Sequence, residues 1–203
     1  MTETEQRPDA RERKKRATRR ALRAATVDLG LQRGLSAVRV EEIAEQAGVS
    51  PRTFFNYFET KEDAALLDLL TVTDDELAEL AAGGPTDDVW AELTRLFAAD
   101  VERADHDGPE LPRVMELQRR EPVLQGRQMA RFARFEARLA TAIGARLPDD
   151  DTARLTARLM SGSCITAVRV GLERWGHNGR QGSPRPHVEA AFAVFAPAFR
   201  PGA

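Results

Sequence analysis

A short stretch near residue 50 carries side chains whose types and spacing could recognise a nucleic acid. Arg52 can donate two parallel hydrogen bonds to a guanine edge, and Asn56 can pair in the same way with adenine. Thr53 offers a methyl group for thymine and a hydroxyl for a phosphate oxygen. With Ser50 and Pro51 they lie within a single run of the sequence, so one short helix could carry all five. The alternative for Arg52 is a solvated surface arginine, or one that holds only a phosphate.

The residues around this stretch predict the elements that would position it. Gly48 can take the left-handed conformation that ends a helix, Ser50 is a good N-cap, and Pro51 suits a first helical position. The pattern predicts two short helices, over about residues 40–47 and 51–58, joined by the tight turn of a DNA-binding helix-turn-helix. The apolar face of the first helix is Val40, Ile43, Ala44 and Ala47.

These residues resemble the DNA-binding signature of TetR-family transcriptional regulators. The resemblance covers about residues 11–65 and rests on Ile43-Ala44, Ala47-Gly48-Val49-Ser50, Thr53, Tyr57-Phe58 and Lys61-Glu62. It implies that Tyr57 and Lys61 hold DNA phosphates, although Tyr57 could equally serve in packing. It also implies that Arg39, where the family commonly has a small capping residue, lies on the path of the phosphates. The sequence SPRTFFNYF (residues 50–58) is similar to a subgroup with acyl-CoA-like ligands.

Aromatic residues in the same stretch differ from the family pattern at two positions. Gly30 replaces a bulky aromatic residue, which leaves less volume in the core, and Phe55 replaces a common tyrosine. Because aromatic side chains bury large apolar areas, Phe54, Phe55 and Phe58 are expected in the core rather than against DNA.

Length and charge fit one DNA-binding module and one larger helical domain. The chain has 203 residues and a net charge of -2, with a positive segment of 9 basic and 2 acidic residues at positions 7–23. A basic segment beside a helix-turn-helix suits phosphate contacts. We expect an all-α fold with a flexible basic arm (1–10), a DNA-binding domain (11–60) and a helical ligand-binding and dimerisation domain (61–203).

The periodicity predicts eight to ten helices. The first spans about residues 11–33, and a connecting helix begins at Thr60 and ends near Ala81 or Ala82. His106–Pro109 is expected as a loop. Later helices are expected near residues 90–97, at 111–115, from Pro122, over about 152–175, and at 188–199.

The resemblance to TetR-family regulators implies that the C-terminal domain binds a second copy of the chain and a small-molecule effector. Small residues of the penultimate helix (Ser161, Gly162, Ser163, Ala167 and Gly171) and an apolar last helix suggest a four-helix dimer interface, or simply the core of one chain. A homodimer would read a pseudo-palindromic double-stranded operator, with recognition helices about 34–36 Å apart. An apolar effector would favour a state in which the fourth helix swings and this spacing is lost. Arg119, Arg120 and Arg127 could meet an anionic group of the ligand, or only solvent. The candidate effector residues, which could instead be ordinary core, are Trp90, Leu93, Phe97, Met115, Met129, Phe132, Phe135, Cys164 and Val168.

Other function classes find little support in the sequence. The histidines occur singly and without metal-ligand spacing, and Cys164 lies in an apolar helix. We expect no cofactor and no enzyme activity, and a cytoplasmic protein without a membrane span or signal peptide. A repressor released by its effector is the first hypothesis. A constitutive DNA-binding protein without a ligand is the second.

Overall fold

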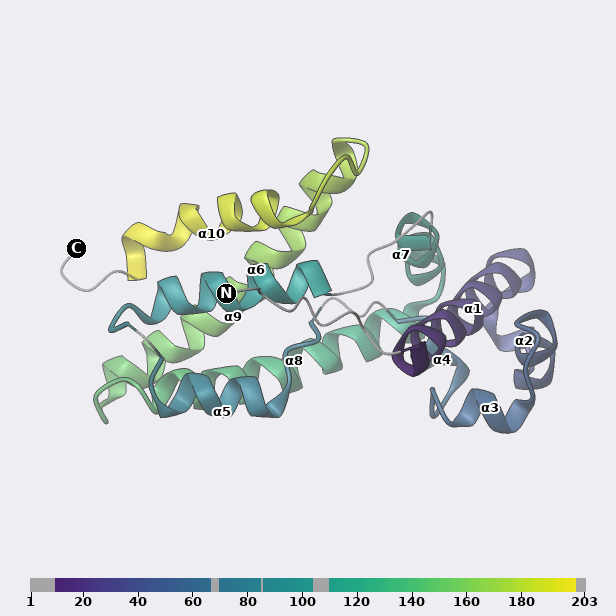
Figure 1. Cartoon of the computed structure of the whole chain (residues 1–203), viewed down its shortest axis with the longest axis horizontal. Coiled ribbons are helices and arrows are strands. Elements are labelled where there is room, and N and C mark those ends of the chain that lie inside the picture. Colours follow the sequence, from purple (N-terminus) through teal and green to yellow (C-terminus); the bar gives the residue numbers. More distant parts are fainter. Residues whose placement is uncertain (1–9, 67–69, 85, 104–109, 200–203) are drawn as a thin grey trace. The chain divides into compact units, whose positions relative to one another are not determined.

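Every element in the described part of the chain, residues 10–66, 70–84, 86–103 and 110–199 of a computed structural model, is a helix (Figure 1). Over these residues, no helix is both long and apolar enough to cross a membrane. The all-α prediction is confirmed. The helices are α1 (Ala10–Arg33), η1 (Leu35–Ala37), α2 (Val40–Gln46), α3 (Pro51–Phe55), α4 (Lys61–Ala64), α5 (Asp74–Ala82), α6 (Val89–Arg103), α7 (Glu110–Arg120), α8 (Pro122–Gly144), α9 (Asp151–His177) and α10 (Arg185–Phe199).

The connecting helix predicted from Thr60 to about Ala82 is two helices, and that prediction is wrong. Helix α4 stops at Ala64, and α5 begins after Thr73, whose hydroxyl accepts from the Glu76 N–H while the Glu76 carboxylate accepts from the Thr73 N–H. The buried Asp100 carboxylate accepts from the Thr71 N–H at 3.0 Å, which holds the approach to α5 outside the helix. The reciprocal capping box between Thr73 and Glu76 is a strong local signal for a helix start, and the apolar periodicity of the sequence hides it. The loop predicted at residues 106–109 lies outside the described residues.

The chain divides into two compact units. Unit 1 comprises Met1–Leu67 and Asp107–Gln128, and unit 2 comprises Asp68–His106 and Met129–Ala203. The division differs from the predicted boundary near residue 60, because α7 and the first residues of α8 join the N-terminal helices. Most of the predicted arm, residues 1–9, is not described.

Helix α7 fills the space that Gly30 leaves in unit 1. A β-carbon on Gly30 would lie 3.0 Å from a methyl group of Leu117, which is fully buried. The expected loss of core volume is therefore compensated by a residue 87 positions away in the sequence. Polar contacts join the same elements, since Arg113 pairs with Asp28, and Glu121 accepts from the Leu35 N–H at 2.9 Å.

Unit 2 is built around aromatic side chains of α6, α8 and α10. The rings of Trp90 and Phe192 lie 5.2 Å apart, and those of Phe97 and Phe192 lie 5.7 Å apart. The Trp90 indole donates to the Phe192 carbonyl at 3.2 Å, so its polar atom is satisfied inside the core. Helix α10 packs closely on α9. At Gly171 of α9 there is room for a hydrogen atom beside Val188 of α10, but not for a β-carbon.

Candidate nucleic-acid interface

The turn between α2 and α3 is set by hydrogen bonds that end one helix and start the next. Gly48 has a φ of +69°, and its N–H donates to the Glu45 carbonyl, while the Val49 N–H donates to the Ala44 carbonyl. This pair of bonds is the Schellman arrangement, in which the residue after the helix adopts the left-handed conformation. Two residues later, the Ser50 hydroxyl accepts from the Thr53 N–H at 3.1 Å and caps α3. The predicted turn is confirmed.

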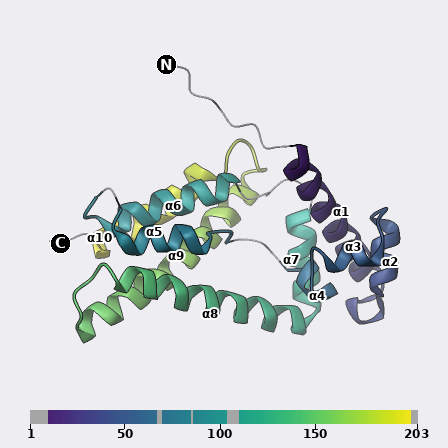
Figure 2. The ribbon, with the colours of Figure 1, turned by 60° about the horizontal axis from the view of Figure 1, so that its bottom comes forward.

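Helix α3 is shorter than predicted, ending at Phe55 rather than Phe58. Its last turn continues as hydrogen-bonded turn structure, with the Phe58 N–H donating to the Phe54 carbonyl at 3.0 Å. Five helical residues span about 7–8 Å, so α3 presents little more than one turn to a groove. Helix α1 lies against α2, and α2 against α3 (Figure 2), which fixes the orientation of this short element within unit 1.

Most of the predicted contact residues lie on the surface. Ser50, Pro51, Arg52 and Asn56 are exposed, whereas Thr53 and Tyr57 are half-buried. Phe54 and Phe58 are buried at 0% and 4% exposure, as predicted. Phe55 is 57% exposed, so its placement in the core was wrong. On a helix that buries Phe54, the next residue points about 100° away, and Phe55 therefore lies beside Arg52 and Asn56 on the exposed side.

Arg39 precedes α2 with its side chain on the surface, 75% exposed. A guanidinium has no acceptor, so it cannot cap the helix as a hydroxyl would. Instead, the Glu42 carboxylate accepts from the Arg39 N–H at 2.9 Å and pairs with Arg33 at 2.7 Å. The backbone N–H of Arg39 and the Arg33 guanidinium hold the pKa of Glu42 below its ordinary value. Glu42 thus fixes the start of α2, and the Arg39 guanidinium, whose Nε lies 3.6 Å from the Glu42 carboxylate, stays largely exposed.

Lys61 is already engaged within the protein. Its ammonium donates to the carbonyls of Val38 at 2.7 Å and Ser36 at 3.2 Å. Lys61 therefore joins the start of α4 to the segment before α2, and its contact with a phosphate stays a prediction. An ammonium has three donors, so these two bonds leave one N–H for a further acceptor.

Three arginines hold this region together, a role that the sequence analysis assigned to none of them. Arg19 lies over the Phe58 ring at 4.6 Å and donates to the Tyr57 carbonyl at 3.3 Å. Arg23 donates to the Ala64 carbonyl at 3.3 Å. Arg127 of α8 donates to the Thr60 hydroxyl at 3.0 Å and pairs with Asp63 at 3.3 Å, rather than facing an anionic ligand. In the sequence, the spacing of four residues between Arg19 and Arg23 was the one feature that indicated a shared helix face.

The structure brings most of the predicted effector residues into unit 2, where they form its core. Phe132 is half-buried; Trp90, Leu93, Phe97, Phe135, Cys164 and Val168 are buried. Met129 is 65% exposed, and Met115 is 44% exposed and belongs to unit 1. Both methionines follow directly after buried residues, Gln128 and Val114, and so point away from the buried side of their helices. Burial raises the pKa of the Cys164 thiol well above its ordinary value, as expected of an unreactive thiol.

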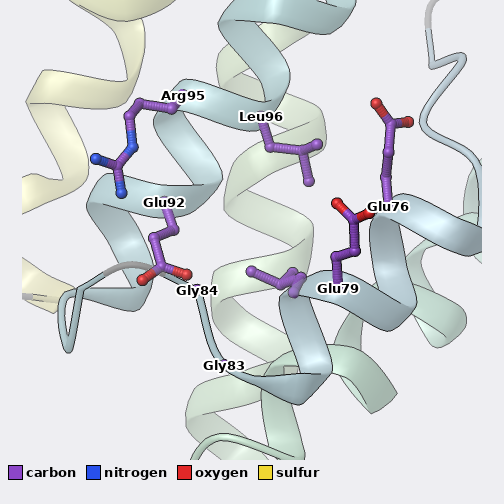
Figure 3. Close-up of a pocket in the computed structure, with 8 residues that line it drawn as sticks. Glu76, Glu79, Gly83, Gly84, Glu92, Arg95 and Leu96 are labelled. Atoms are coloured by element: carbon purple, nitrogen blue, oxygen red, sulfur yellow. The ribbon is translucent and has the colours of Figure 1, made fainter.

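A pocket of about 540 Å³ opens between α5 and α6, away from these aromatic residues. Figure 3 shows Glu92 of α6 directed at the loop around Gly84, with Glu76 and Glu79 projecting from α5. Glu92 is 6% exposed and pairs with Arg146 at 2.6 Å. Burial raises the pKa of Glu92, but hydrogen bonds from Arg146 and Thr86 outweigh it and lower the pKa overall. The pocket wall thus carries three carboxylates and the guanidinium of Arg95, and arginines outside the pocket pair with Glu76 and Glu92.

Comparisons with known proteins agree with this geometry. Residues 22–66 match the family model for bacterial regulatory proteins of the tetR family, and residues 87–200 match that for the MftR C-terminal domain. The HTH-type transcriptional regulator TcmR of Streptomyces glaucescens is 34% identical over 145 residues, which cover 68% of this chain and 64% of TcmR. The match thus spans less than two thirds of that relative's length.

Solved structures show the same fold at low sequence identity. NalD, the secondary repressor of the MexAB-OprM multidrug efflux pump in Pseudomonas aeruginosa, aligns with a TM-score of 0.56 at 16% identity, over 94% of this chain and 100% of NalD. SmeT, the repressor of the Stenotrophomonas maltophilia multidrug efflux pump SmeDEF, aligns with a TM-score of 0.51 at 16% identity, over 92% and 94%. A capped helix-turn-helix in the N-terminal unit, joined to a C-terminal domain whose family model covers more than half of the sequence, places the chain in the TetR family of bacterial transcriptional regulators.

Proposed function

We propose that the protein is a transcriptional repressor that binds a pseudo-palindromic operator as a homodimer and leaves it when a small, largely apolar effector binds. The observation that carries DNA binding is α3, which follows a capped turn and exposes Arg52 and Asn56 side by side with Ser50 and Pro51. NalD and SmeT are repressors by description, which supports repression as the direction of control.

A gel shift with the DNA upstream of the protein's own gene tests this proposal. At physiological salt and with excess random competitor, we expect a discrete complex that the competitor does not remove. Complexes that the competitor abolishes on this DNA and on genomic fragments alike would contradict specific recognition.

Arg52 is proposed to read a base and Arg39 to hold a phosphate. Replacing Arg52 with alanine should weaken operator binding by about 1–3 kcal/mol and random-DNA binding much less, since a base contact carries sequence information. The matched change Arg39→Ala should weaken binding to the operator and to random DNA by the same factor, because phosphate contacts are independent of sequence. Binding isotherms of both variants on both duplexes measure this. An equal loss on both DNAs for Arg52→Ala would reassign Arg52 to the backbone.

The solvent face of α10 supports the homodimer. Its exposed residues are all apolar: Pro186, Ala190, Ala193, Val194, Pro197 and Ala198. Helix α9 adds Leu155, Leu159 and Val170, each between 41% and 59% exposed. By contrast, the small residues predicted for the interface serve the chain's own packing, since Ser161 and Ala167 are buried and Gly171 meets Val188 of α10. We therefore assign the dimer contact to the outer faces of α9 and α10, as an apolar surface of this extent favours a second copy.

Val194, which is 78% exposed, lies on this face and offers a direct test. Val194→Glu should convert the dimer to a monomer, because the interface would have to bury an unpaired carboxylate. Light scattering on a sizing column measures the mass. Val123→Glu, on the surface of unit 1 at 53% exposure, is the control and should leave the mass unchanged. A wild-type monomer would contradict the homodimer, and a dimer that Val194→Glu retains would place the interface elsewhere.

The effector is proposed to bind among the aromatic residues of unit 2. The acyl chain of an acyl-CoA-like molecule would suit this apolar site better than the open pocket between α5 and α6, whose lining carries three carboxylates and Arg95. The rings of Trp90 and Phe97 each pack against the ring of Phe192, so an effector must separate them. This packing also favours the second candidate, a constitutive repressor without an effector.

Linkage separates these two candidates. A molecule that raises the midpoint of thermal unfolding and weakens operator binding must also bind the DNA complex more weakly than the free protein. The two affinities must fall by the same factor. Acyl-CoA species and neutral apolar compounds can be screened in this way. If every compound that stabilises the protein leaves operator affinity unchanged, the constitutive candidate holds.

A further inference from the structure

Phe55 leaves a large aromatic ring in solvent at the end of α3. Of the aromatic side chains in the described part of the chain, Phe55 alone is exposed, at 57%. Single apolar residues are common on protein surfaces, so exposure by itself assigns no role to this ring. Its position is more informative, because Phe55 is the last residue of the helix that carries Arg52.

Helix α3 presents an apolar row and a polar row next to each other. Pro51 and Phe55, four residues apart, form the apolar row, and Arg52 and Asn56, also four apart, form the polar row. All four side chains are exposed. Asn56 belongs to this arrangement because its backbone stays helical, with a φ of -74° and a ψ of -15°. A step of three residues turns a helix by about 300°, so Phe55 lies about 60° from Arg52 around the axis. A surface that meets Arg52 therefore also meets the ring.

The core of unit 1 restricts the Phe55 ring in the free protein. The rings of Phe55 and Phe54 meet edge to face, with centroids 5.5 Å apart and planes at 86°. This is a favoured geometry for an aromatic pair, and Phe54 is fully buried. The contact therefore anchors one side of the exposed ring to the core. A side chain that is already ordered loses less conformational entropy when it binds, so the ring is prepared for a contact with a partner.

A phenyl ring can recognise a single feature of the major groove. It has no hydrogen-bond donor or acceptor. The base edges in that groove present donors, acceptors and one apolar group, which is the C5-methyl group of thymine. The base 5-methylcytosine carries a methyl group at the same ring position, whereas cytosine and uracil carry none. The ring therefore suits a pyrimidine with a C5-methyl group, and a contact with it would exclude water from both apolar surfaces.

We propose that Phe55 is a specificity-determining residue, which packs on the C5-methyl group of a pyrimidine beside the base read by Arg52. The assignment rests on the proposed DNA binding and adds a contact that the polar side chains cannot make. Cβ atoms three residues apart on a helix are about 5–6 Å apart, and successive base pairs about 3.4 Å, so the methyl group lies about one or two base pairs from the base at Arg52. DNA fits better than a protein partner, because the ring shares its exposed side with Arg52 and Asn56, whose side chains match base edges.

Deoxyuridine in place of thymine removes the methyl group and keeps the base pair, so it tests this contact directly. The full chain first selects its preferred site from a pool of random duplexes. Each thymine of the selected site is then replaced singly by deoxyuridine, and each cytosine by 5-methylcytosine. Affinities are measured for the wild type, for Phe55→Ala and for Phe55→Tyr, which keeps the ring. Val123→Ala, at another apolar residue of unit 1 that is 53% exposed, is the matched control.

We expect a thymine in each half-site at which deoxyuridine weakens wild-type binding about fourfold, as expected for the loss of one buried methyl group. Changing both half-sites should weaken binding about fifteenfold. If the base is a cytosine, 5-methylcytosine should instead strengthen binding by about the same factor, which tells the two sources of the methyl group apart. Phe55→Ala should bind the selected site more weakly than the wild type and respond to neither change. Phe55→Tyr and Val123→Ala should respond as the wild type does.

Equal responses of the wild type and Phe55→Ala at every position would overturn the assignment, because the methyl effect would then come from the shape of the DNA and not from the ring. A selected site on which no methyl group changes wild-type affinity would overturn it without any variant. Both results would leave specific DNA binding intact. A pool that yields no preferred site would instead count against the proposed function, and the assignment would fall with it.

Discussion

Replacing Glu92 with alanine should lower the free energy of unfolding by about 3 kcal/mol, the lower end of the range for breaking a buried ion pair. The side chains of Glu92 and Arg146 are only 6% and 10% exposed, and their closest atoms lie 2.6 Å apart. Glu92 also accepts from the N–H of Thr86 at 3.0 Å, while Arg146 donates to the Thr86 carbonyl at 2.8 Å. The pair therefore joins α6, the turn after α8 and the loop after α5, and alanine leaves the guanidinium without this counter-charge. Because Arg146 keeps its hydrogen bonds to carbonyls and lies beside an open pocket, the expected loss of unfolding free energy is at the lower end of the range for a buried ion pair.

Chemical denaturation of the variant measures this loss, and Arg154→Ala is its matched control. Arg154 pairs with Asp149 and Asp151, but these side chains are between 61% and 98% exposed. Pairs of this kind contribute about 0–1 kcal/mol, so Arg154→Ala should be nearly neutral. A similar loss in both variants would mean that the burial of Glu92 has no energetic consequence.

The same pair predicts how stability depends on pH. The folded-state pKa of Glu92 is lowered, so its contribution is complete above the unfolded-state value. It is then lost as the pH falls below about 4. Stability of the wild type should therefore drop more steeply than that of Glu92→Ala between about pH 5 and 3. Parallel curves for the two proteins would contradict the lowered pKa.

Replacing Gly171 with leucine should lower the free energy of unfolding by about 3 kcal/mol, at the upper end of the cost of overpacking. A β-carbon at this position would lie 2.6 Å from the Cα and 2.9 Å from the backbone nitrogen of Val188. Backbone atoms cannot rotate away as a side chain can, so α9 and α10 must move apart. Since α9 and α10 also carry the proposed dimer contact, the variant should lose dimer affinity as well.

Gly176 is the control on the same helix, because a β-carbon there meets nothing within 4 Å. Gly176→Ala should raise stability by up to about 1 kcal/mol, since alanine has the higher helix propensity. Gly171→Ala should fall between the two variants. Thermal or chemical unfolding of the three proteins gives the order directly, and a stable Gly171→Leu protein would contradict the close approach of α9 and α10.

Signals that act within a few residues were read correctly from the sequence. Gly48, Ser50 and Pro51 predicted the turn, and the structure shows the hydrogen bonds that make it. Thr60 was likewise predicted as a helix start, and its hydroxyl accepts from the Asp63 N–H. Helix caps and turns depend on neighbouring side chains and backbone angles, so they are encoded locally.

Exposure was predicted less well, because it depends on which side of a helix meets the rest of the protein. Phe55 was expected in the core, and Met115 and Met129 at an effector site, but all three are exposed. Their residue types suit burial, yet each follows a position that occupies the buried side. On any helix with one buried side, a step of one residue can move a side chain from core to solvent.

The sequence alone was enough to predict a helical protein, the turn of its helix-turn-helix, and the gathering of positive charge beside that motif. Tertiary structure decided the rest through contacts between distant residues. Leu117 fills the space at Gly30, Glu92 pairs with Arg146, and Gly171 admits Val188. The physical reason is that caps and charge runs act between neighbours, whereas packing and buried ion pairs need partners that only the folded chain brings together.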